Sequence, residues 1–325
     1  MDLNGDGHPD VLSGSWPGEL FLFLGQSDRS FAAPVMLRDK DGEIINIGGG
    51  IKEESDGRIL IHGHAKFENT DEGTFANYHG KRIESTPDKP IAITGTASAV
   101  TTADWDADGD LDLIVADIGG SVHLVPNEGT AKNYAFGQAV PLQRAPSSRA
   151  GPCVADWDGD GRLDLLVGAG DGSVSLYRNI GTAEKPKLAD ARELVPPGKT
   201  TYGPDAPKEA TRGGRSKICV ADWNGDGKLD LLVGDVATQK PDRPEPTAEE
   251  QAEYDRIRKE MEPIRKRYGE LIGRLHGRNR PRTKEEQDQL HVDLRAVGDK
   301  LQALQEKLPR DYEMHGWVWL FLRTN

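Results

Sequence analysis

The sequence predicts an all-β chain that is interrupted by one pair of helices. Hydrophobic residues make up only 36% of the chain, which also contains 38 glycines and 20 prolines. This mixture favours short strands joined by tight turns. A nine-residue acidic phrase recurs four times, each time ahead of a short apolar run. A helical heptad pattern runs only through residues 244–309.

The four acidic phrases share one spacing of oxygen-bearing side chains. They read DLNGDGHPD from Asp2, DWDADGDLD from Asp104, DWDGDGRLD from Asp156 and DWNGDGKLD from Asp222. Each is followed by an apolar run (VLSG, LIVA, LLVG and LLVG), a glycine-containing turn and a second apolar run. Stretches such as SAVTTADW and KICVADW predict an entering strand ahead of the loop. Each repeat is therefore strand, acidic loop, strand, turn and strand, and a further strand is expected in the first three copies.

The length of the repeat indicates how these units assemble. Units of roughly 40–50 residues with about four antiparallel strands are typical of propeller blades. We therefore expect a β-propeller of four-stranded antiparallel blades in residues 1–239, with repeats starting near 1, 97, 149 and 214. Residues 38–96 lack the acidic phrase and are either an insertion or a degenerate blade. The first copy has no entering strand, so we expect the native amino terminus to lie upstream of Met1.

The phrase DxDxDGxxD, placed between two strands and followed by an apolar run that ends in glycine, resembles the FG-GAP or VCBS repeat of integrin-type β-propellers. The resemblance covers residues 1–37, 97–235 and 314–325, with Leu3 where the other copies have tryptophan. It implies a calcium-binding interaction module outside the cytoplasm, either secreted, periplasmic or on the cell surface. It also implies a protein or glycan ligand, which the sequence does not identify.

The spacing within each loop suits a hard cation. Calcium takes six to eight oxygen ligands, and a glycine at position 6 lets a loop curl around the ion. Positions 1, 3, 5 and 9 supply side-chain oxygens, and position 7 supplies a backbone carbonyl. The expected side-chain ligands are Asp2, Asn4, Asp6, Asp10, Asp104, Asp106, Asp108, Asp112, Asp156, Asp158, Asp160, Asp164, Asp222, Asn224, Asp226 and Asp230. The expected carbonyl ligands are His8, Asp110, Arg162 and Lys228.

Other interpretations of these loops are weaker. An EF-hand needs Glu at position 12, which is occupied by Ser13, Val115, Val167 and Val233. Magnesium prefers a tight octahedron that retains several waters. Asp-rich turns without an ion do not require the same spacing four times. We expect Ca²⁺ to act as a structural staple between strands, with no other cofactor.

Residues 244–309 predict an antiparallel helical hairpin inserted into the last repeat. Apolar residues alternate at spacings of three and four from Tyr254 to Leu275 and from Leu290 to Leu308, as in a coiled coil. Thr247 with Glu250 and Thr283 with Glu286 form capping-box pairs, and GRNRPR (277–282) provides the turn. Residues 314–325 are then the final strand of the last blade.

Charge and cysteine content limit the partners and the compartment. The formal charge of −13 argues against nucleic acid, and no apolar run is long enough for membrane insertion. We expect no secretion leader in the opening residues MDLNGDG. Cys153 and Cys219 each precede an acidic phrase by three residues, so they occupy equivalent strands. We predict that both are free thiols, with a disulfide between them as the alternative.

The sequence favours a binding module over an enzyme but leaves the choice open. It contains no discernible Ser-His-Asp or Cys-His set, so we assign no catalytic residue. A polysaccharide lyase or hydrolase would use a base such as His64, His79 or Lys66 beside a calcium ion. A zinc site at His62, His64 and His79, near Asp71 and Glu72, is disfavoured. A third reading is an adhesion or assembly subunit that docks through the helical arm.

Overall fold

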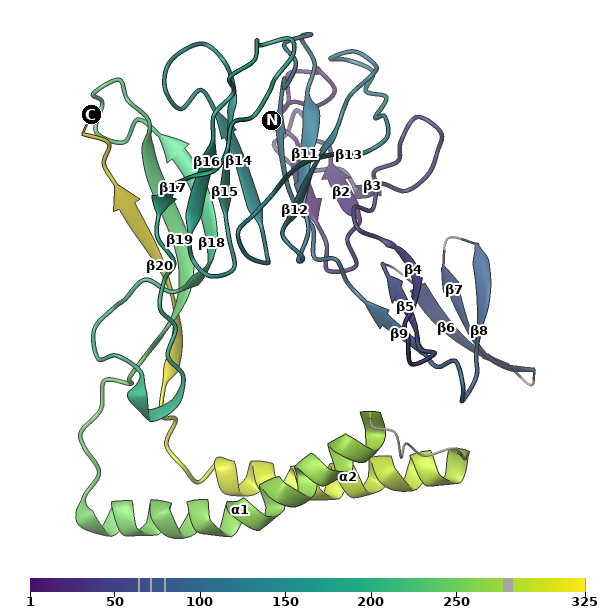
Figure 1. Cartoon of the computed structure of the whole chain (residues 1–325), viewed down its shortest axis with the longest axis vertical. Coiled ribbons are helices and arrows are strands. Elements are labelled where there is room, and N and C mark those ends of the chain that lie inside the picture. Colours follow the sequence, from purple (N-terminus) through teal and green to yellow (C-terminus); the bar gives the residue numbers. More distant parts are fainter. Residues whose placement is uncertain (64, 71, 79, 277–282, 325) are drawn as a thin grey trace. The chain divides into compact units, whose positions relative to one another are not determined.

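The computed structural model describes residues 1–324, except for residues 64, 71, 79 and 277–282. The described chain is all-β apart from a short 3-10 turn and two helices, and it divides into two compact units (Figure 1). The first unit contains Met1–Thr201, Ala210–Thr238 and Met314–Asn325. The second contains Tyr202–Glu209 and Gln239–Glu313.

Four sheets of the first unit carry the acidic phrases, and we call them repeat sheets 1 to 4 in chain order. Sheet 1 contains β1 (Val11–Gly14), β2 (Leu20–Phe23) and β3 (Val35–Met36). Sheet 2 contains β10 (Ala99–Ala103), β11 (Asp112–Ala116), β12 (Ser121–Val125) and β13 (Val140–Arg144). Sheet 3 contains β14 (Gly151–Ala155), β15 (Asp164–Gly168), β16 (Val174–Tyr177) and β17 (Arg192–Val195). Sheet 4 contains β18 (Gly214–Ala221), β19 (Asp230–Gln239) and β20 (Glu313–Phe321).

The register places the acidic loops of repeat sheets 2, 3 and 4 at the same point of each sheet. The last residue of the entering strand pairs with the closing aspartate: Ala103 with Asp112, Ala155 with Asp164 and Ala221 with Asp230. Strands β11 and β15 then continue as DLIVA and DLLVG, in which every residue is buried. A strand buried on both faces is apolar throughout rather than alternating. Sheets 2 and 3 therefore lie between neighbours on both sides.

Successive repeat sheets meet through their first strands and share apolar cores. Strand β10 contacts both β1 and β14, and β14 contacts β18. One core joins Leu3 of sheet 1 to Leu113 of sheet 2, and a second joins Trp105 of sheet 2 to Leu165 of sheet 3. A third core joins Leu176 of sheet 3 to Leu231 of sheet 4, so one type of sheet-to-sheet contact occurs three times.

Residues 38–96 fold differently from the repeats. Strands β4 (Gly50–Glu53), β5 (Ile59–His62) and β9 (Ile91–Thr94) form one three-stranded sheet, in which β5 and β9 are parallel. Strands β6 (Ala65–Thr70), β7 (Gly73–Tyr78) and β8 (Lys81–Ser85) form another. The first of these sheets differs in order from repeat sheets 2 and 3, because β9 joins it only after β6, β7 and β8 have formed the second sheet. The second sheet joins consecutive antiparallel strands but has only three of them.

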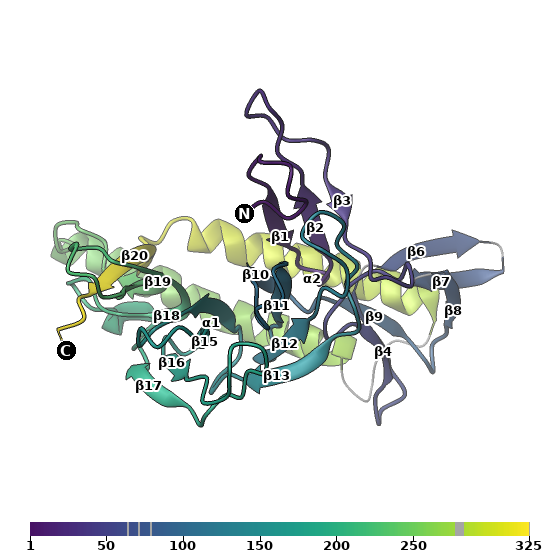
Figure 2. The ribbon, with the colours of Figure 1, turned by 90° about the horizontal axis from the view of Figure 1, so that it is seen from above.

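The second unit is built around two long helices, α1 (Ala248–His276) and α2 (Lys284–Gln305). Ile257 and Met261 of α1 share a cluster with Leu304 of α2, and Leu271 further along α1 shares one with Leu290 at the start of α2. The helices are therefore antiparallel, and both views show them side by side (Figures 1 and 2). Both expected capping pairs form reciprocal hydrogen bonds, whereas the GRNRPR turn lies outside the described residues. Neither helix combines the length and the apolar character needed to cross a membrane.

Cys153 and Cys219 are free thiols on the neighbouring strands β14 and β18. Burial raises the pKa of Cys153 to about 11, so this thiol is protonated at neutral pH.

Candidate metal sites

The closing aspartate of each acidic loop is a buried acceptor for two backbone N–H groups. One carboxylate oxygen accepts a hydrogen bond from the N–H of the second residue of the loop. The other accepts a hydrogen bond from the N–H of a residue just after the second strand that follows the loop. The N–H donors are Leu3 and Gly25 for Asp10, Trp105 and Asn127 for Asp112, Trp157 and Asn179 for Asp164, and Trp223 and Arg323 for Asp230. These eight bonds are 2.7–3.1 Å long. Sequence reasoning assigned position 9 only as a metal ligand and missed this structural role.

The loop backbone curls around the carboxylate at position 1. In three loops, the carboxylate at position 1 accepts two or three hydrogen bonds from backbone N–H groups of the same loop. These carboxylates belong to Asp2, Asp156 and Asp222. Position 4 has positive φ in all four loops: Gly5, Gly159 and Gly225, but Ala107 in the second loop at φ 56°. Alanine in this region costs about 1 kcal/mol, so loop 104–112 folds against a local backbone penalty. Its Asp104 accepts only one loop N–H bond, from Gly109.

The residues expected to donate carbonyls show a regular contact of their own. In every loop the N–H of position 7 donates to the carboxylate at position 5. The pairs are His8 to Asp6, Asp110 to Asp108, Arg162 to Asp160 and Lys228 to Asp226. These bonds hold the position 5 carboxylate inside the curl.

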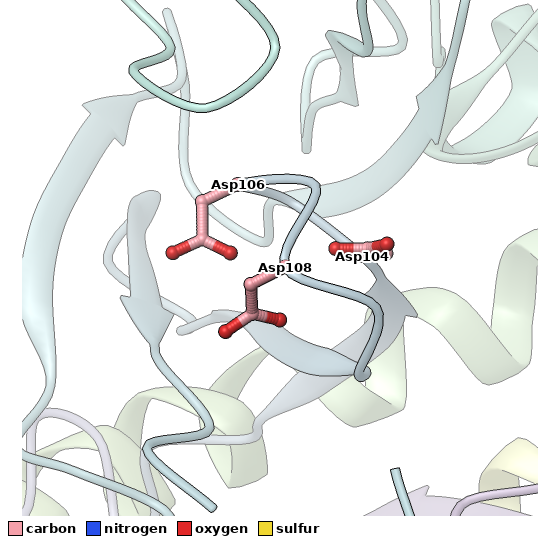
Figure 3. A group of neighbouring side chains, drawn as sticks. All are labelled: Asp104, Asp106 and Asp108. Atoms are coloured by element: carbon pink, nitrogen blue, oxygen red, sulfur yellow. The ribbon is translucent and has the colours of Figure 1, made fainter. Parts of the chain in front are cut away.

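Loop 104–112 gathers unbalanced negative charge. Asp104, Asp106 and Asp108 each offer a carboxylate oxygen, and these atoms lie within 4.8 Å of one another (Figure 3). One oxygen each of Asp104, Asp106 and Asp110 is buried without a hydrogen-bond partner. Among the residues that the structure describes, no Lys, Arg or His forms an ion pair with this loop.

Burial and mutual repulsion disturb the ionisation of this loop. Desolvation, followed by the charge of Asp108, raises the pKa of both Asp106 and Asp110. Desolvation also raises the pKa of Asp112 to about 6, against the opposing effect of its two backbone N–H bonds. The loop therefore resists full ionisation unless a cation is present.

Loop 156–164 has the same spacing but a different charge balance. Asp156, Asp158 and Asp164 bring carboxylate oxygens within 4.8 Å of one another. Arg178 forms an ion pair with Asp158 and lies 3.5 Å from Asp160, which also pairs with Arg162. Two guanidinium groups thus offset part of the negative charge, although one oxygen of Asp158 is still buried without a partner.

The first and fourth loops use an amide at position 3. The Asn4 side chain donates to Asp6 at 2.9 Å, and that of Asn224 donates to Asp226 at 3.2 Å. Backbone hydrogen bonds from His8 and Lys228 respectively are the main cause of the lowered pKa of Asp6 and Asp226. These two loops therefore hold ionised carboxylates with less mutual repulsion than loop 104–112.

The donor chemistry of all four loops fits a hard divalent cation. Every side-chain donor is a carboxylate or amide oxygen, which is the ligand type that calcium takes in six- to eight-fold coordination. The partnerless oxygens of Asp104, Asp106 and Asp158 are the acceptors that an ion in those loops would satisfy. In loop 104–112 the residues at positions 1, 3 and 5 would hold the ion, whereas in loop 156–164 they are those at positions 1, 3 and 9.

Residues considered for other chemistry are not brought to these loops. His62 lies in β5 and Lys66 in β6, in sheets separate from every acidic loop. The other candidates, His64, Asp71 and His79, lie outside the described residues.

A family model of the FG-GAP-like repeat matches residues 104–167 and 156–233. The two matches contain the second, third and fourth acidic loops, which confirms the resemblance predicted from the sequence. No curated protein sequence matches the chain.

Two solved structures show distant similarity to the chain. A crystal structure of BBS1N in complex with ARL6DN, soaked with lead, has 19% identity and a TM-score of 0.24, covering 42% of this chain and 38% of that one. The periplasmic gluconolactonase PpgL of Pseudomonas aeruginosa has 15% identity and a TM-score of 0.27, covering 72% and 64%. The chain thus spans less than two thirds of both proteins, and at these TM-scores neither similarity supports a statement about its fold or function.

Proposed function

We propose that this chain is a calcium-stabilised β-propeller module that binds a protein or glycan outside the cytoplasm. The FG-GAP-like repeats support the propeller, and the acidic loops support the ion. The observation that carries the proposal is the set of buried carboxylate oxygens on Asp104, Asp106 and Asp158 that lack a hydrogen-bond donor. A buried anionic oxygen without a partner is costly, and a bound cation removes that cost.

The repeat sheets support a radial arrangement of blades. They contact one another through the entering strands β10, β14 and β18, which are expected to line a propeller axis, and β1 of the first sheet contacts β10. Val318 of β20 is 72% exposed, whereas the equivalent Val122 and Val174 are fully buried against the next sheet. Sheet 4 therefore presents an apolar face of the kind that carries a further blade.

Calcium has a structural role in this proposal. The second, third and fourth loops each join the end of one strand to the start of the next, and the closing aspartate accepts backbone N–H bonds from both ends of its repeat. An ion held there cross-links strands that are already paired, so its binding free energy adds to the folding free energy. A calcium sensor needs a mobile helix pair, and these loops lie between short strands.

Calorimetric titration and thermal melting test this proposal. We expect calcium to bind and to raise the melting temperature, and we expect EDTA to reverse the rise. The double variant Asp106→Asn/Asp108→Asn should lose part of the binding heat, because it removes two charges from one cluster. Asp88→Asn, an exposed residue outside the acidic loops, is the matched control. Absence of calcium binding together with an unchanged melting temperature would refute the proposal.

A further inference from the structure

Two cations meet where repeat sheets 3 and 4 contact each other. Arg149 lies two residues before β14, and Lys217 lies on β18, the neighbouring entering strand. The Lys217 ammonium donates to the carbonyl oxygen of Ala150 at 3.2 Å. Its side chain crosses Gly151, where a Cβ atom would lie only 2.9 Å from both Cδ and Nζ of the lysine. The glycine therefore leaves the room that brings the ammonium to Arg149.

The two cations are short of negative charge. Among the residues that the structure describes, neither Arg149 nor Lys217 forms an ion pair. Desolvation, followed by the positive charge of Arg149, lowers the pKa of Lys217. Both effects disfavour the charged ammonium, and an anion bound beside it would oppose both of them. The pair is thus the counterpart, with opposite sign, of the unbalanced charge in loop 104–112.

The repeat fold does not require these cations. Arg149 and Lys217 precede the first aspartate of their acidic loops by seven and five residues, and Ala97 and Gly151 occupy these two positions at the contact between sheets 2 and 3. Ala97 and Arg149 have the same left-handed backbone, at φ 49° and 57°. The same contact between sheets thus forms with uncharged residues at both positions. The arginine and the lysine are therefore a special feature of the later contact.

The acidic loops lie too far away to balance the pair. Asp156, the first residue of the loop after β14, follows Arg149 by seven residues. A strand rises about 3.3 Å per residue, so the two residues are roughly 20 Å apart. This separation exceeds the Debye length of about 8 Å at physiological ionic strength. A local excess of positive charge therefore persists, although the whole chain has a formal charge of −13.

We propose that Arg149 and Lys217 bind a doubly charged phosphate group, either as free phosphate or as the phosphate ester of a small molecule. Two positive charges match its two negative charges, and the guanidinium donates to two oxygens while the ammonium donates to a third. The bound group connects sheet 3 to sheet 4 through these two side chains. The site goes beyond the proposed calcium function, because it uses no residue of an acidic loop.

Phosphate binding to the whole chain is measured in EDTA, because calcium would otherwise combine with the phosphate. We expect saturable binding in calorimetry and chemical-shift changes at the amides of residues 149–151 and 217. Acetate, which carries one charge, should bind about tenfold more weakly. Glucose 6-phosphate distinguishes the two sources: binding tighter than that of inorganic phosphate assigns the site to a phosphate ester, and weaker binding assigns it to free phosphate.

Variants separate the position of the two charges from their number. Lys217→Met and Arg149→Asn each remove one charge, and asparagine tolerates the left-handed backbone, so each should weaken binding about tenfold. Gly151→Ala keeps both charges but displaces the Lys217 ammonium, so it should also weaken binding. Arg215→Asn is the matched control, because Arg215 is exposed, has φ 61° and occupies the position of Arg149 in sheet 4. An unchanged melting temperature shows that each variant retains the fold.

Four results would overturn the inference. They are no saturable binding up to about 10 mM phosphate, equal binding of acetate, unchanged binding in Gly151→Ala, and an equal loss in Arg215→Asn and Arg149→Asn. The last result would attribute the affinity to general charge rather than to this pair. All titrations are made without calcium, so failure of the calcium proposal would leave their outcome unchanged.

Discussion

Loops 104–112 and 156–164 have the same spacing of acidic residues but balance their charge in different ways. In the second of them, Arg178 and Arg162 form ion pairs with Asp158 and Asp160. In the preceding repeat, Pro126 is equivalent to Arg178 and Asp110 is equivalent to Arg162. Loop 104–112 therefore has no arginine to balance its charge, and Asp110 is a fifth carboxylate in it. The family spacing therefore does not by itself determine how strongly a loop depends on a metal ion.

The difference arises from residues outside the repeated phrase. Arg178 directly follows β16, the third strand of its sheet, and its side chain forms an ion pair with Asp158 of the loop. The guanidinium of Arg178 provides part of the positive charge that a metal ion would otherwise supply. It also competes with the ion for the Asp158 carboxylate. We therefore expect the stability of loop 104–112 to depend more on calcium than that of loop 156–164.

The largest expected effect concerns the feature that the two loops share. Asp112→Ala or Asp164→Ala removes a carboxylate that is 2% or 0% exposed and leaves two buried backbone N–H groups without acceptors. Each change should lower the free energy of unfolding of the calcium-free protein by about 3–5 kcal/mol. Urea denaturation in EDTA measures this, with the exposed Asp108→Ala as control. A cost below about 1 kcal/mol would mean that the closing aspartate is not a structural tie.

The second prediction concerns pH and applies to loop 104–112. The pKa of Asp112 is raised to about 6, above its ordinary value of 3.8, so between these values the folded protein holds a proton that the unfolded chain has released. This stabilisation is fully present below pH 4 and is lost as the pH rises through about 6, by roughly 2–3 kcal/mol in metal-free protein.

Urea denaturation from pH 4 to pH 8, with EDTA and with calcium, measures this effect. Calcium binds the ionised carboxylates, so it should abolish the loss at higher pH. A metal-free stability that rises across this range would contradict the assigned burial of Asp112.

The sequence predicted the elements governed by local spacing. The acidic loops, their flanking strands and the two helices follow from periodicities that lie within a few tens of residues, and the resemblance of the repeats to the FG-GAP-like family is confirmed over residues 104–233. The ion pair of Arg178 did not follow, because the contact depends on the register of β16 and the equivalent residue in the preceding repeat is Pro126. The parallel pairing of β5 with β9 was equally hidden, since the strands β6, β7 and β8 separate them in the chain. Nor does any local pattern show that position 9 accepts two backbone N–H bonds, one of which comes from 15 residues away in sheets 2 and 3.

The third prediction tests the competition between Arg178 and an ion. Arg178→Gln should raise the calcium affinity of loop 156–164 about three- to tenfold, because the ion no longer displaces a guanidinium from Asp158. The calcium affinity is measured by calorimetry in a protein that also carries Asp106→Asn, because this substitution reduces the heat of calcium binding to loop 104–112. Arg192→Gln is the matched control, since it removes a nearby charge that forms no ion pair with the described residues. An equal gain in the control would attribute the effect to general charge rather than to the contact.

The smallest expected effect comes from transferring the arginine between the loops. Asp110→Arg places a guanidinium at the position of Arg162 and removes the fifth carboxylate from loop 104–112. We expect it to stabilise the metal-free protein by about 0.5–1 kcal/mol, because it relieves the repulsion that raises the pKa of Asp106 and offers a partner to Asp108. The same variant should reduce the increase in melting temperature that calcium produces. Asp110→Asn removes the charge without adding a cation, so it separates relief of repulsion from ion pairing. If both variants stabilise the protein equally and both retain the full response to calcium, the arginines of loop 156–164 do not stand in for an ion.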